Sequence, residues 1–359
     1  MAYLTTSFWE GKEVLVTGHT GFKGMWLSIY LKNMGAKVFG ISISGDDDEK
    51  ILYRNAKNSK VFSDESFIDI RDGERTKKTI SEINPEIVFH LAAQPLVRLS
   101  YETPIETFQT NIIGTANVLD GVRLAPSTSK VICVTSDKCY RNVEQVWGYR
   151  ENDPLGGADP YSASKGAAEI ISYSMWHSFL KEKNVSMATV RAGNVIGGGD
   201  YSSDRIMTDI VKSKVNKKIL DLRNPYATRP WQHVLEPIHA YTLIVEEILT
   251  SAPGSYSSFN VGPDASSIKT VNELVNEVTK CWSLKIHHDY KNKIKLHEAQ
   301  LLSLDNSKVK SETSWRPKWD FEMTIKKTIN WYERFLQTDN ALALCDEDIN
   351  DYFGESKDE

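Results

Sequence analysis

Tyr161 and Lys165 are the two side chains of this 359-residue chain whose types and spacing most directly suggest chemistry. They open an amphipathic segment that we predict as a helix over 161–183, and a spacing of four residues places both on one helical face. A lysine ammonium beside a phenol favours the phenolate and so lowers the phenol pKa. Such a tyrosine can take a proton from a hydroxyl group near neutral pH. This spacing is common by itself, so a pair of surface residues is the alternative interpretation.

A glycine pattern near the N-terminus predicts a nucleotide site. A β-branched and apolar run over 13–17 leads into Gly18, Gly21 and Gly24, and an amphipathic segment to Met34 follows. This order of strand, tight turn and helix lets the backbone approach a pyrophosphate, which then meets the N–H groups at the helix start. A glycine-rich turn in an unrelated α/β protein is the alternative. The flanking strand and helix favour the dinucleotide site.

Four polar residues stand at the end of another apolar run. The run over 130–135 predicts a strand, and Thr135, Ser136, Asp137 and Lys138 occupy its end and the turn that follows. Active sites of open α/β sheets lie at the carboxyl ends of strands. We therefore expect this turn to face the tyrosine–lysine pair.

The elements that must position these residues alternate between strands and helices. The predicted strands are near-continuous apolar runs, as in a parallel sheet that is covered on both faces. They span Glu13–Thr17, Lys37–Ser42, Ser66–Ile70, Glu86–Ala92, Lys130–Thr135 and Ser186–Ala192. The helices between them are predicted at Gly24–Met34, Gly73–Ile83, Pro104–Leu124 and Tyr161–Lys183. This alternation predicts an α/β fold with a doubly wound parallel (Rossmann) sheet.

After Asn194 this rhythm breaks, which predicts a smaller second unit. We assign 1–195 to a dinucleotide-binding domain with a return segment at about 234–264, and 196–233 plus 265–345 to a mixed α/β C-terminal substrate domain. The helices expected after Asn194 span 203–218, 236–249, 271–281 and 321–336, with strands at 219–222 and 258–261. Segment 223–233 is too polar and too rich in proline to predict an element. The acidic tail, 346–359, is expected to fray.

Composition excludes several classes of protein. A net charge of -5 argues against a general nucleic-acid or anionic-membrane binder, and no apolar run approaches the length of a membrane span. The first ten residues lack the basic and apolar regions of a signal peptide. The four cysteines show neither paired nor metal-ligand spacing, which fits a cytoplasmic protein. The eight histidines form no metal-ligand cluster, so we expect no metal.

Together these patterns resemble the extended short-chain dehydrogenase/reductase family over nearly the whole chain. The glycine turn and the tyrosine–lysine pair carry the resemblance, together with Asp69-Ile70, Leu91-Ala92-Ala93 and Asn111. It implies NAD(P) and hydride transfer at a carbinol carbon. The residues that it assigns to the cofactor are Gly18, Thr20, Gly21, Phe22, Lys23, Gly24, Asp69, Ile70, Leu91, Ala92, Ala93, Gln94, Asn111, Thr135, Tyr161 and Lys165.

A narrower resemblance, to the cytidine type of sugar-nucleotide 4,6-dehydratases, rests on five longer segments. They span 18–24, 92–98, 136–140, 191–200 and 229–234. The distinguishing tripeptide is Ser136-Asp137-Lys138, where the thymidine type carries Thr-Asp-Glu and an epimerase usually lacks the acidic residue. The resemblance implies CDP-glucose as substrate and a 4-keto-6-deoxy sugar nucleotide as product.

This resemblance also implies a role for each catalytic residue. Tyr161, aided by Lys165, would remove the proton of the 4-hydroxyl, which Ser136 would hydrogen-bond, while hydride passes from C4 to NAD⁺. Asp137 is the candidate acid for the leaving 6-hydroxyl. Lys138 is either the base at C5 or an electrostatic stabiliser of the enolate, and both roles stay open. Hydride then returns to C6.

Further residues are candidates for binding the substrate. A guanidinium can grip phosphate oxygens in bidentate fashion, which favours Arg229 and Arg205 for the diphosphate over the alternative of solvated surface charges. Asn194 is expected to hold the substrate, as the matching residue does in the family. The remaining candidates are Tyr226 and His233 for the nucleotide, Arg98 facing the site, and Glu298 as a ribose acceptor. Packing is the alternative for Tyr226.

We favour NAD over NADP. The residue expected to bind the ribose 2′-hydroxyl falls on Ser44, with Asp46, Asp47 and Asp48 just beyond it, and no arginine stands nearby for a 2′-phosphate. A redox cycle that closes within one turnover also favours an NAD that never leaves.

Two other functions are alternatives to the dehydratase, and the two long helices also predict an oligomer. A nucleotide-sugar 4-epimerase would not need Asp137, and a non-catalytic dinucleotide-binding regulatory protein would usually have lost Tyr161 or Lys165. The helices at 104–124 and 161–183 are apolar on two sides, and in the family such helices pair across a dimer axis. This implies a homodimer or homotetramer, and burial of both faces within one subunit is the alternative.

Overall fold

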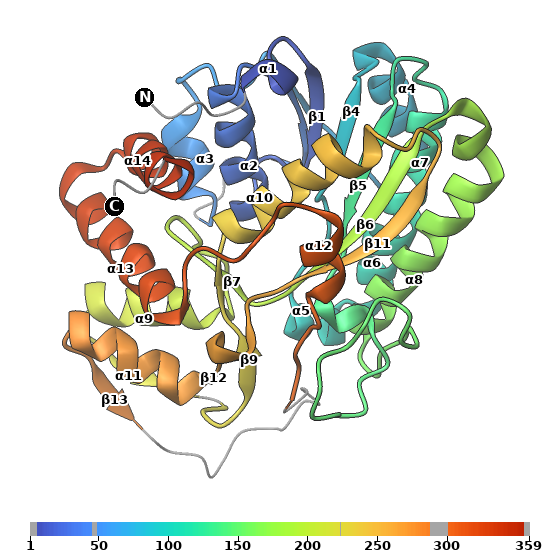
Figure 1. Cartoon of the computed structure of the whole chain (residues 1–359). Helices are drawn as coiled ribbons and strands as arrows, with labels where there is room; N and C mark the ends of the chain where they lie inside the picture. Colours follow the sequence, from blue (N-terminus) through green and yellow to red (C-terminus); the bar gives the residue numbers. More distant parts are fainter. Residues whose placement is uncertain (1–5, 45–48, 223, 288–300, 355–359) are drawn as a thin grey trace.

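The apolar runs form one seven-stranded parallel sheet in the computed structural model (Figure 1), which describes residues 6–44, 49–222, 224–287 and 301–354. The strand order is β11-β6-β5-β4-β1-β2-β3. The strands are β1 (Glu13–Thr17), β2 (Lys37–Ser42), β3 (Asp64–Phe67), β4 (Ile87–His90), β5 (Lys130–Val134), β6 (Ser186–Ala192) and β11 (Tyr256–Val261). The chain winds outward in both directions from β1 and β4, which confirms the predicted doubly wound α/β fold.

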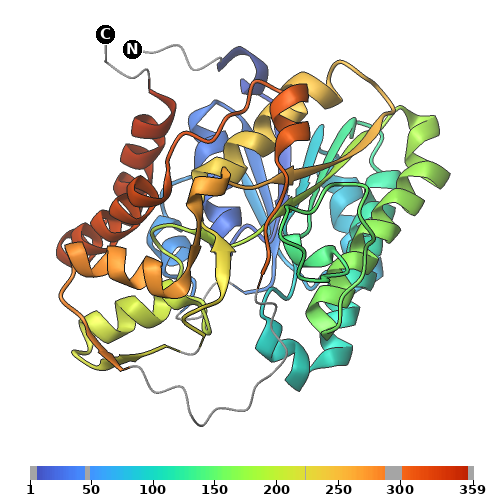
Figure 2. The ribbon, with the colours of Figure 1, turned by 60° about the horizontal axis from the view of Figure 1, so that its bottom comes forward.

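Helices cover both faces of the sheet (Figures 1 and 2). Successive strand residues point to opposite faces, so Val14 and Val16 join one core cluster while Leu15 joins the other. The larger cluster lies against α2 (Phe22–Asn33), α10 (Leu235–Leu243), α13 (Phe321–Thr338) and α14 (Ala341–Phe353). The smaller one lies against α4 (Gly73–Ile83), α7 (Gly114–Arg123) and the end of the helix that begins with α8 (Pro160–Met175).

The two long predicted helices are present with local changes of winding. The first consists of α6 (Pro104–Phe108), a π-helical turn (Gln109–Ile113) and α7. The second consists of α8, a π-helical turn (Trp176–Leu180) and a 3₁₀ turn (Lys181–Lys183). No helix within the described residues is long and apolar enough to cross a membrane.

After β6 the chain builds short elements beyond the sheet and then returns to it. The short strands pair as β7 (Val195–Ile196) with β10 (Gln232–His233), β9 (Thr228–Pro230) with β12 (Ile268–Thr270), and β8 (Ile219–Asp221) with β13 (Lys285–His287). The expectation that 223–233 holds no element was wrong, because these pairings use backbone groups that side-chain polarity does not reveal. The remaining elements are α1 (Thr6–Trp9), α3 (Ile51–Ala56), α5 (Val97–Glu102), α9 (Ile206–Val215), a π-helical turn (Ile244–Leu249), a 3₁₀ turn (Ala265–Ser267), α11 (Val271–Cys281) and α12 (Ser307–Glu312). The division into two domains stays a prediction.

The C-terminal tail does not fray over its described part, so this prediction was wrong for 346–354. Helix α14 packs against α2 and α3, and it buries Leu344, Cys345, Ile349 and Tyr352. The Tyr352 hydroxyl donates a hydrogen bond of 2.6 Å to the Glu236 carboxylate on α10. The helical spacing of these buried residues outweighs the acidic composition of the segment.

A buried ion pair ties α8 to the centre of the sheet. Arg191 Nη2 on β6 lies 2.8 Å from Glu169 Oε2 on α8, and both side chains are at most 3% exposed. Glu169 also accepts hydrogen bonds from the hydroxyls of Thr189, at 2.7 Å, and Thr135. Arg191 Nη1 donates to the Tyr140 hydroxyl at 2.7 Å. Because every charged atom of Glu169 has a partner, the pair can be held away from water.

Removing one partner of this pair should be costly. We expect Arg191→Leu to lower the free energy of unfolding by about 3–5 kcal/mol, because it leaves Glu169 charged and buried without compensation. Urea denaturation followed by circular dichroism measures the loss. The double variant Arg191→Leu/Glu169→Leu is the control and should recover most of the stability. An equal loss in the double variant would contradict the charge-compensation argument.

Candidate active site

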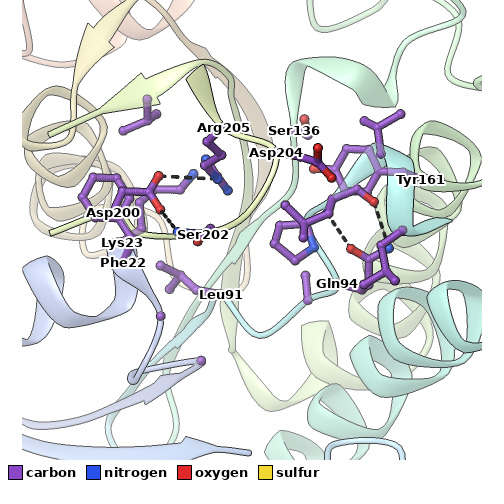
Figure 3. Close-up of a pocket in the computed structure, with 18 of the residues that line it drawn as sticks. Phe22, Lys23, Leu91, Gln94, Ser136, Tyr161, Asp200, Ser202, Asp204 and Arg205 are labelled. Atoms are coloured by element: carbon purple, nitrogen blue, oxygen red, sulfur yellow. Dashed lines mark hydrogen bonds and ion pairs between the residues drawn. The ribbon is translucent and has the colours of Figure 1, made fainter. Parts of the chain in front are cut away.

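A cavity of about 920 Å³ opens at the carboxyl ends of the parallel strands (Figure 3). Its walls come from the segments that follow β1, β2, β3, β4, β5 and β6 and from the loop around 200–206. This is the position that a doubly wound sheet provides for ligands, where neighbouring loops part on either side of the strands.

The glycine turn after β1 forms the floor of one end of the cavity. Gly18 has a φ of +74°, and a Cβ there would lie 2.8 Å from the Ala92 backbone nitrogen. A Cβ on Gly24 would lie 2.2 Å from the Gly18 carbonyl oxygen. Gly21 caps α2 without a side-chain acceptor, so the first-turn N–H groups are not met by a capping side chain. This geometry fits the diphosphate of a dinucleotide.

The predicted cofactor residues lie together, with one exception. Those that line the cavity are Gly18, Thr20, Gly21, Phe22, Lys23, Gly24, Asp69, Ile70, Leu91, Ala92, Ala93, Gln94, Thr135, Tyr161 and Lys165. Asn111 is buried beneath the wall and does not line the cavity. Its side chain accepts from the Gln94 N–H at 2.8 Å and donates to the Gln94 carbonyl at 3.0 Å and to the Ser164 hydroxyl at 2.8 Å. The Asn111 amide therefore fixes the loop after β4, which is a structural role, and a direct contact of Asn111 with the cofactor stays a prediction.

Asp69 and Arg71 mark the other end of the dinucleotide region. Arg71 Nε donates to Asp69 Oδ2 at 2.8 Å, and this guanidinium holds the pKa of Asp69 below its usual value. Lys50 also lines this end and donates to the Ser44 carbonyl oxygen at 2.5 Å. Asp46–Asp48 lie outside the described residues, so the choice of a partner for the ribose 2′-hydroxyl stays a prediction.

The start of α8 places Tyr161 and Lys165 in the cavity. Asp159 caps the helix by accepting the Ser162 N–H at 2.9 Å, and Pro160 follows as the first helical residue. Burial raises the pKa of Tyr161 to about 12, against the hydrogen bond from Ser136. Burial lowers the pKa of Lys165 to about 8. In the protein alone the pKa of Tyr161 is therefore raised rather than lowered, because removal from water is the largest effect and the charges of Asp137 and Asp159 add to it.

The turn after β5 presents Asp137 and Lys138 opposite this helix. Ser136 begins a 3₁₀ turn (Asp137–Cys139), where its hydroxyl accepts the Lys138 N–H at 3.2 Å and donates to Asp137 Oδ1 at 2.9 Å. Asp137 is 2% exposed. All five predicted catalytic residues, Ser136, Asp137, Lys138, Tyr161 and Lys165, line the cavity.

The segment after β6 shapes the other side of Asp137. A Cβ on Gly193 would lie 1.9 Å from Asp137 Oδ2, so the carboxylate rests directly on the glycine backbone. Asn194 adopts a φ of +48°, and its Nδ2 lies 3.4 Å from the same oxygen. The carboxyl group of Asp137 is therefore held by hydroxyl, amide and backbone surfaces rather than by an ion pair at contact distance.

The substrate candidates divide into three groups. Arg98, Asn194, Arg205 and Arg229 line the cavity. Tyr226 is 71% exposed and does not line it, which argues against core packing, and its contact with the nucleotide stays a prediction. His233 is fully buried with its ring edge-to-face against Trp26 and Trp319, which excludes the predicted nucleotide contact. Glu298 lies outside the described residues.

Sequence reasoning missed the acidic residues of the loop after β7. Asp200 and Asp204 line the cavity; Asp200 Oδ2 lies 3.4 Å from Arg205 Nε, and Asp204 Oδ1 lies 3.5 Å from Arg98 Nη1. Asp200 ends one of the five resembling segments, and that was the one available signal. The glycine-rich turn at this point predicts a loop, but the sequence does not show that this loop forms part of the cavity wall.

Known proteins are similar to this chain over nearly its whole length. A relative from Salmonella typhimurium described as "CDP-glucose 4,6-dehydratase" is 43% identical over 96% of this chain and 97% of its own length. A "dTDP-glucose 4,6-dehydratase" from Xanthomonas campestris is 24% identical over 89% of this chain and 92% of its own.

Solved structures share the fold. A dTDP-glucose 4,6-dehydratase from Bacillus anthracis in complex with NAD superimposes with a TM-score of 0.75 at 21% identity, over 91% of this chain and 98% of that one. A UDP-glucose-4-epimerase from Stenotrophomonas maltophila with bound NAD gives 0.78 at 18% identity, over 91% and 99%. The family model described as GDP-mannose 4,6 dehydratase matches residues 15–328. With this match and the 43% identical relative, the chain belongs to the GDP-mannose 4,6 dehydratase family, which confirms the resemblance drawn from its motifs.

Proposed function

We propose that this protein is an NAD-dependent lyase that converts CDP-glucose to CDP-4-keto-6-deoxyglucose with loss of water. The observation that carries the proposal is the buried Asp137 carboxyl in the same cavity as Tyr161 and Lys165. Epimerisation at C4 needs a group that exchanges one hydroxyl proton, whereas loss of the 6-hydroxyl also needs a proton donor. The 43% identical relative, described as a CDP-glucose 4,6-dehydratase, supports both the base and the sugar.

The glycine turn and the segments after β3 and β4 would hold NAD. The diphosphate would meet the start of α2, and the adenosine end would lie toward Asp69 and Ile70. NAD, when bound, supplies a hydride acceptor at C4 and a hydride donor at C6, so it is restored within one turnover. NAD rather than NADP follows from this internal cycle.

The first step would place the proton of the sugar 4-hydroxyl on Tyr161 Oη. Because burial raises the pKa of this phenol to about 12, the phenolate requires nearby positive charge. Lys165, one turn further along the same helical face, would supply it. Ser136, which hydrogen-bonds the phenol, would also hold the 4-hydroxyl oxygen. This arrangement orients one hydroxyl toward one base.

The elimination would use the turn after β5. A 4-ketone makes the C5 proton acidic, and Asp137 in its protonated form would give a proton to O6 as the hydroxyl leaves. Lys138, the next residue, either removes the C5 proton or stabilises the enolate by its charge, and we keep both roles. Asn194, whose amide lies 3.4 Å from Asp137, would contact the sugar from the segment after β6.

Three arginines would receive the substrate diphosphate. Arg98, Arg205 and Arg229 come from three different segments and all line the cavity. Planar guanidinium groups suit phosphate oxygens, and an acidic partner beside Arg98 and Arg205 keeps each side chain near the cavity wall.

The assembly that we propose is a homodimer, or a tetramer built from such dimers. Large apolar side chains stand exposed on the two long helices: Ile105 is 65%, Ile113 52%, Ile170 60% and Tyr173 51% exposed. Pairing of these helices between two copies would remove this surface from water.

The four cysteines are free thiols, which supports the proposed cytoplasmic location.

The main test is turnover of CDP-glucose with and without added NAD⁺. We expect a product one water lighter by mass, with the base-dependent absorbance of a 4-keto sugar. Tyr161→Phe should lower turnover by about 10²–10⁴-fold, because it removes the proton acceptor. Asp137→Asn should lower product formation to a similar extent yet still allow the reduced-nicotinamide absorbance to rise, because only elimination needs this acid.

Other outcomes of this test point elsewhere. A sugar nucleotide of unchanged mass and inverted C4 would support an epimerase and refute the argument from Asp137. No reaction with cytidine, thymidine, uridine or guanosine diphosphate sugars would favour a binding protein without turnover.

Gly193→Ala tests the support of Asp137. The new Cβ would displace the carboxylate, from which it would lie 1.9 Å, and a shift of this size should lower kcat by about 100-fold. Gly262→Ala is the matched control, because its Cβ would meet Leu304 at an ordinary 3.5 Å. Steady-state kinetics with CDP-glucose measures both. An unchanged kcat in Gly193→Ala would show that Asp137 does not depend on this contact.

Ile170→Asp tests the proposed assembly. A charge in the centre of the helix-pairing face should convert the dimer to monomers, because it cannot be desolvated there. Analytical ultracentrifugation measures the mass. Val215→Asp on α9, at a similarly exposed position, is the control and should leave the mass unchanged. A monomeric wild-type protein would refute the dimer.

A further inference from the structure

Lys23 is a charged residue within the glycine turn, and its side chain lines the cavity. It is the second residue of α2, next to the point where the turn exposes helical N–H groups. Figure 3 draws it beside Asp200 and Arg205 on one wall. The glycines meet the steric and φ requirements of the turn, and these requirements do not explain why a lysine stands at this position.

The charges around Lys23 leave this wall positive. Arg205 and Lys165 repel its ammonium, while Asp137 and Asp200 attract it. Asp200 is 3% exposed and also serves Arg205, whose Nε lies 3.4 Å from Asp200 Oδ2. Two buried carboxylates, Asp137 and Asp200, thus face three cations, Lys23, Arg205 and Lys165. The positive end of the α2 dipole adds to the positive charge near Lys23. A ligand that brings negative charge to this wall would relieve the repulsion between Lys23 and Arg205.

We propose that Lys23 binds the diphosphate of the dinucleotide in its ammonium form, and that dinucleotide binding is therefore coupled to the uptake of a proton. This inference rests on the dinucleotide site of the proposed function. It adds the residue that sets how the affinity of that site depends on pH.

The sign of the effect follows from the surroundings of Lys23. Burial, with the charges of Arg205 and Lys165, lowers its pKa to about 7 in the protein alone. A diphosphate beside the ammonium favours the charged form and raises the pKa. Affinity is therefore greatest below about pH 7, and it falls as the pH rises from there to the higher pKa of the complex. Asp137, Asp200, Arg205 and Lys165 face the same region, so the test must separate Lys23 from them.

Isothermal titration calorimetry of the full chain, freed of any copurified dinucleotide, tests the inference. Each titration is run at one pH in two buffers of different ionisation enthalpy, with NAD⁺ and with ADP-ribose, which keeps the diphosphate and lacks the nicotinamide. For the wild type at pH 7 we expect uptake of about half a proton with either probe, as a group of pKa about 7 becomes fully charged.

Two variants and a control assign the proton. Lys23→Met should take up close to none and bind both probes roughly tenfold more weakly at pH 6.5, the size of one charge-assisted contact. Lys23→Arg should bind tightly at pH 8 without proton uptake, because a guanidinium stays charged. Lys32→Met, at the exposed last turn of the same helix, should match the wild type.

Proton uptake that persists in Lys23→Met, or affinities within twofold of the wild type, would overturn the inference. Weakened binding of NAD⁺ with unchanged binding of ADP-ribose would also overturn it, since the contact would then not be to the diphosphate. A wild type that binds neither probe would overturn the dinucleotide site itself. Binding without a proton effect would leave the proposed function intact and remove only the role of Lys23.

Discussion

The buried ion pair between Glu169 and Arg191 is the interaction on which the position of the catalytic helix depends. Two charges removed from water are tolerated only when their geometry supplies partners, and here hydroxyls from β5 and β6 complete the shell of Glu169. Glu169 lies one helical turn beyond Lys165 and two beyond Tyr161 on the same face. Because this carboxylate is anchored to the sheet, the rotation of α8 is fixed, and the tyrosine–lysine pair must face the turn after β5.

The cavity beside this ion pair has two features, glycines at points of close approach and charged side chains of both signs along its walls. Gly18, Gly24 and Gly193 each remove a Cβ at a place where backbone or a carboxylate must approach closely. Cations gather along its walls from segments that are distant in sequence, and acidic residues of the 200–205 loop stand among them. In a site of restricted water such charges act strongly on one another and on a ligand. Negatively charged diphosphates are the ligands that such a cavity suits, at the cofactor end and at the substrate end.

Much of the fold and the catalytic centre could be predicted because local patterns specify them. The strand 186–192 and the helix 271–281 were predicted with the bounds that the structure has. The strand is a continuous buried run, and the helix is amphipathic and begins with a capping box. Predictions from residue type alone were less reliable. His233 is a core residue because Trp26 and Trp319 enclose it, and the acidic segment after 345 is a packed helix because its apolar residues recur at helical spacing.

The sequence by itself determined the alternation of strands and helices, the glycine turn and the candidate catalytic residues, all of which line the cavity. These depend on backbone preference and on short-range spacing, which neighbouring residues encode. Only the tertiary structure decided that Asn111 fixes a loop, that Gly193 supports Asp137, and that Lys23, Asp200 and Arg205 share one wall of the cavity. Each of these depends on contacts between residues far apart along the chain. Packing sets the direction in which these side chains point and how far they are removed from water, and no local sequence pattern encodes either property.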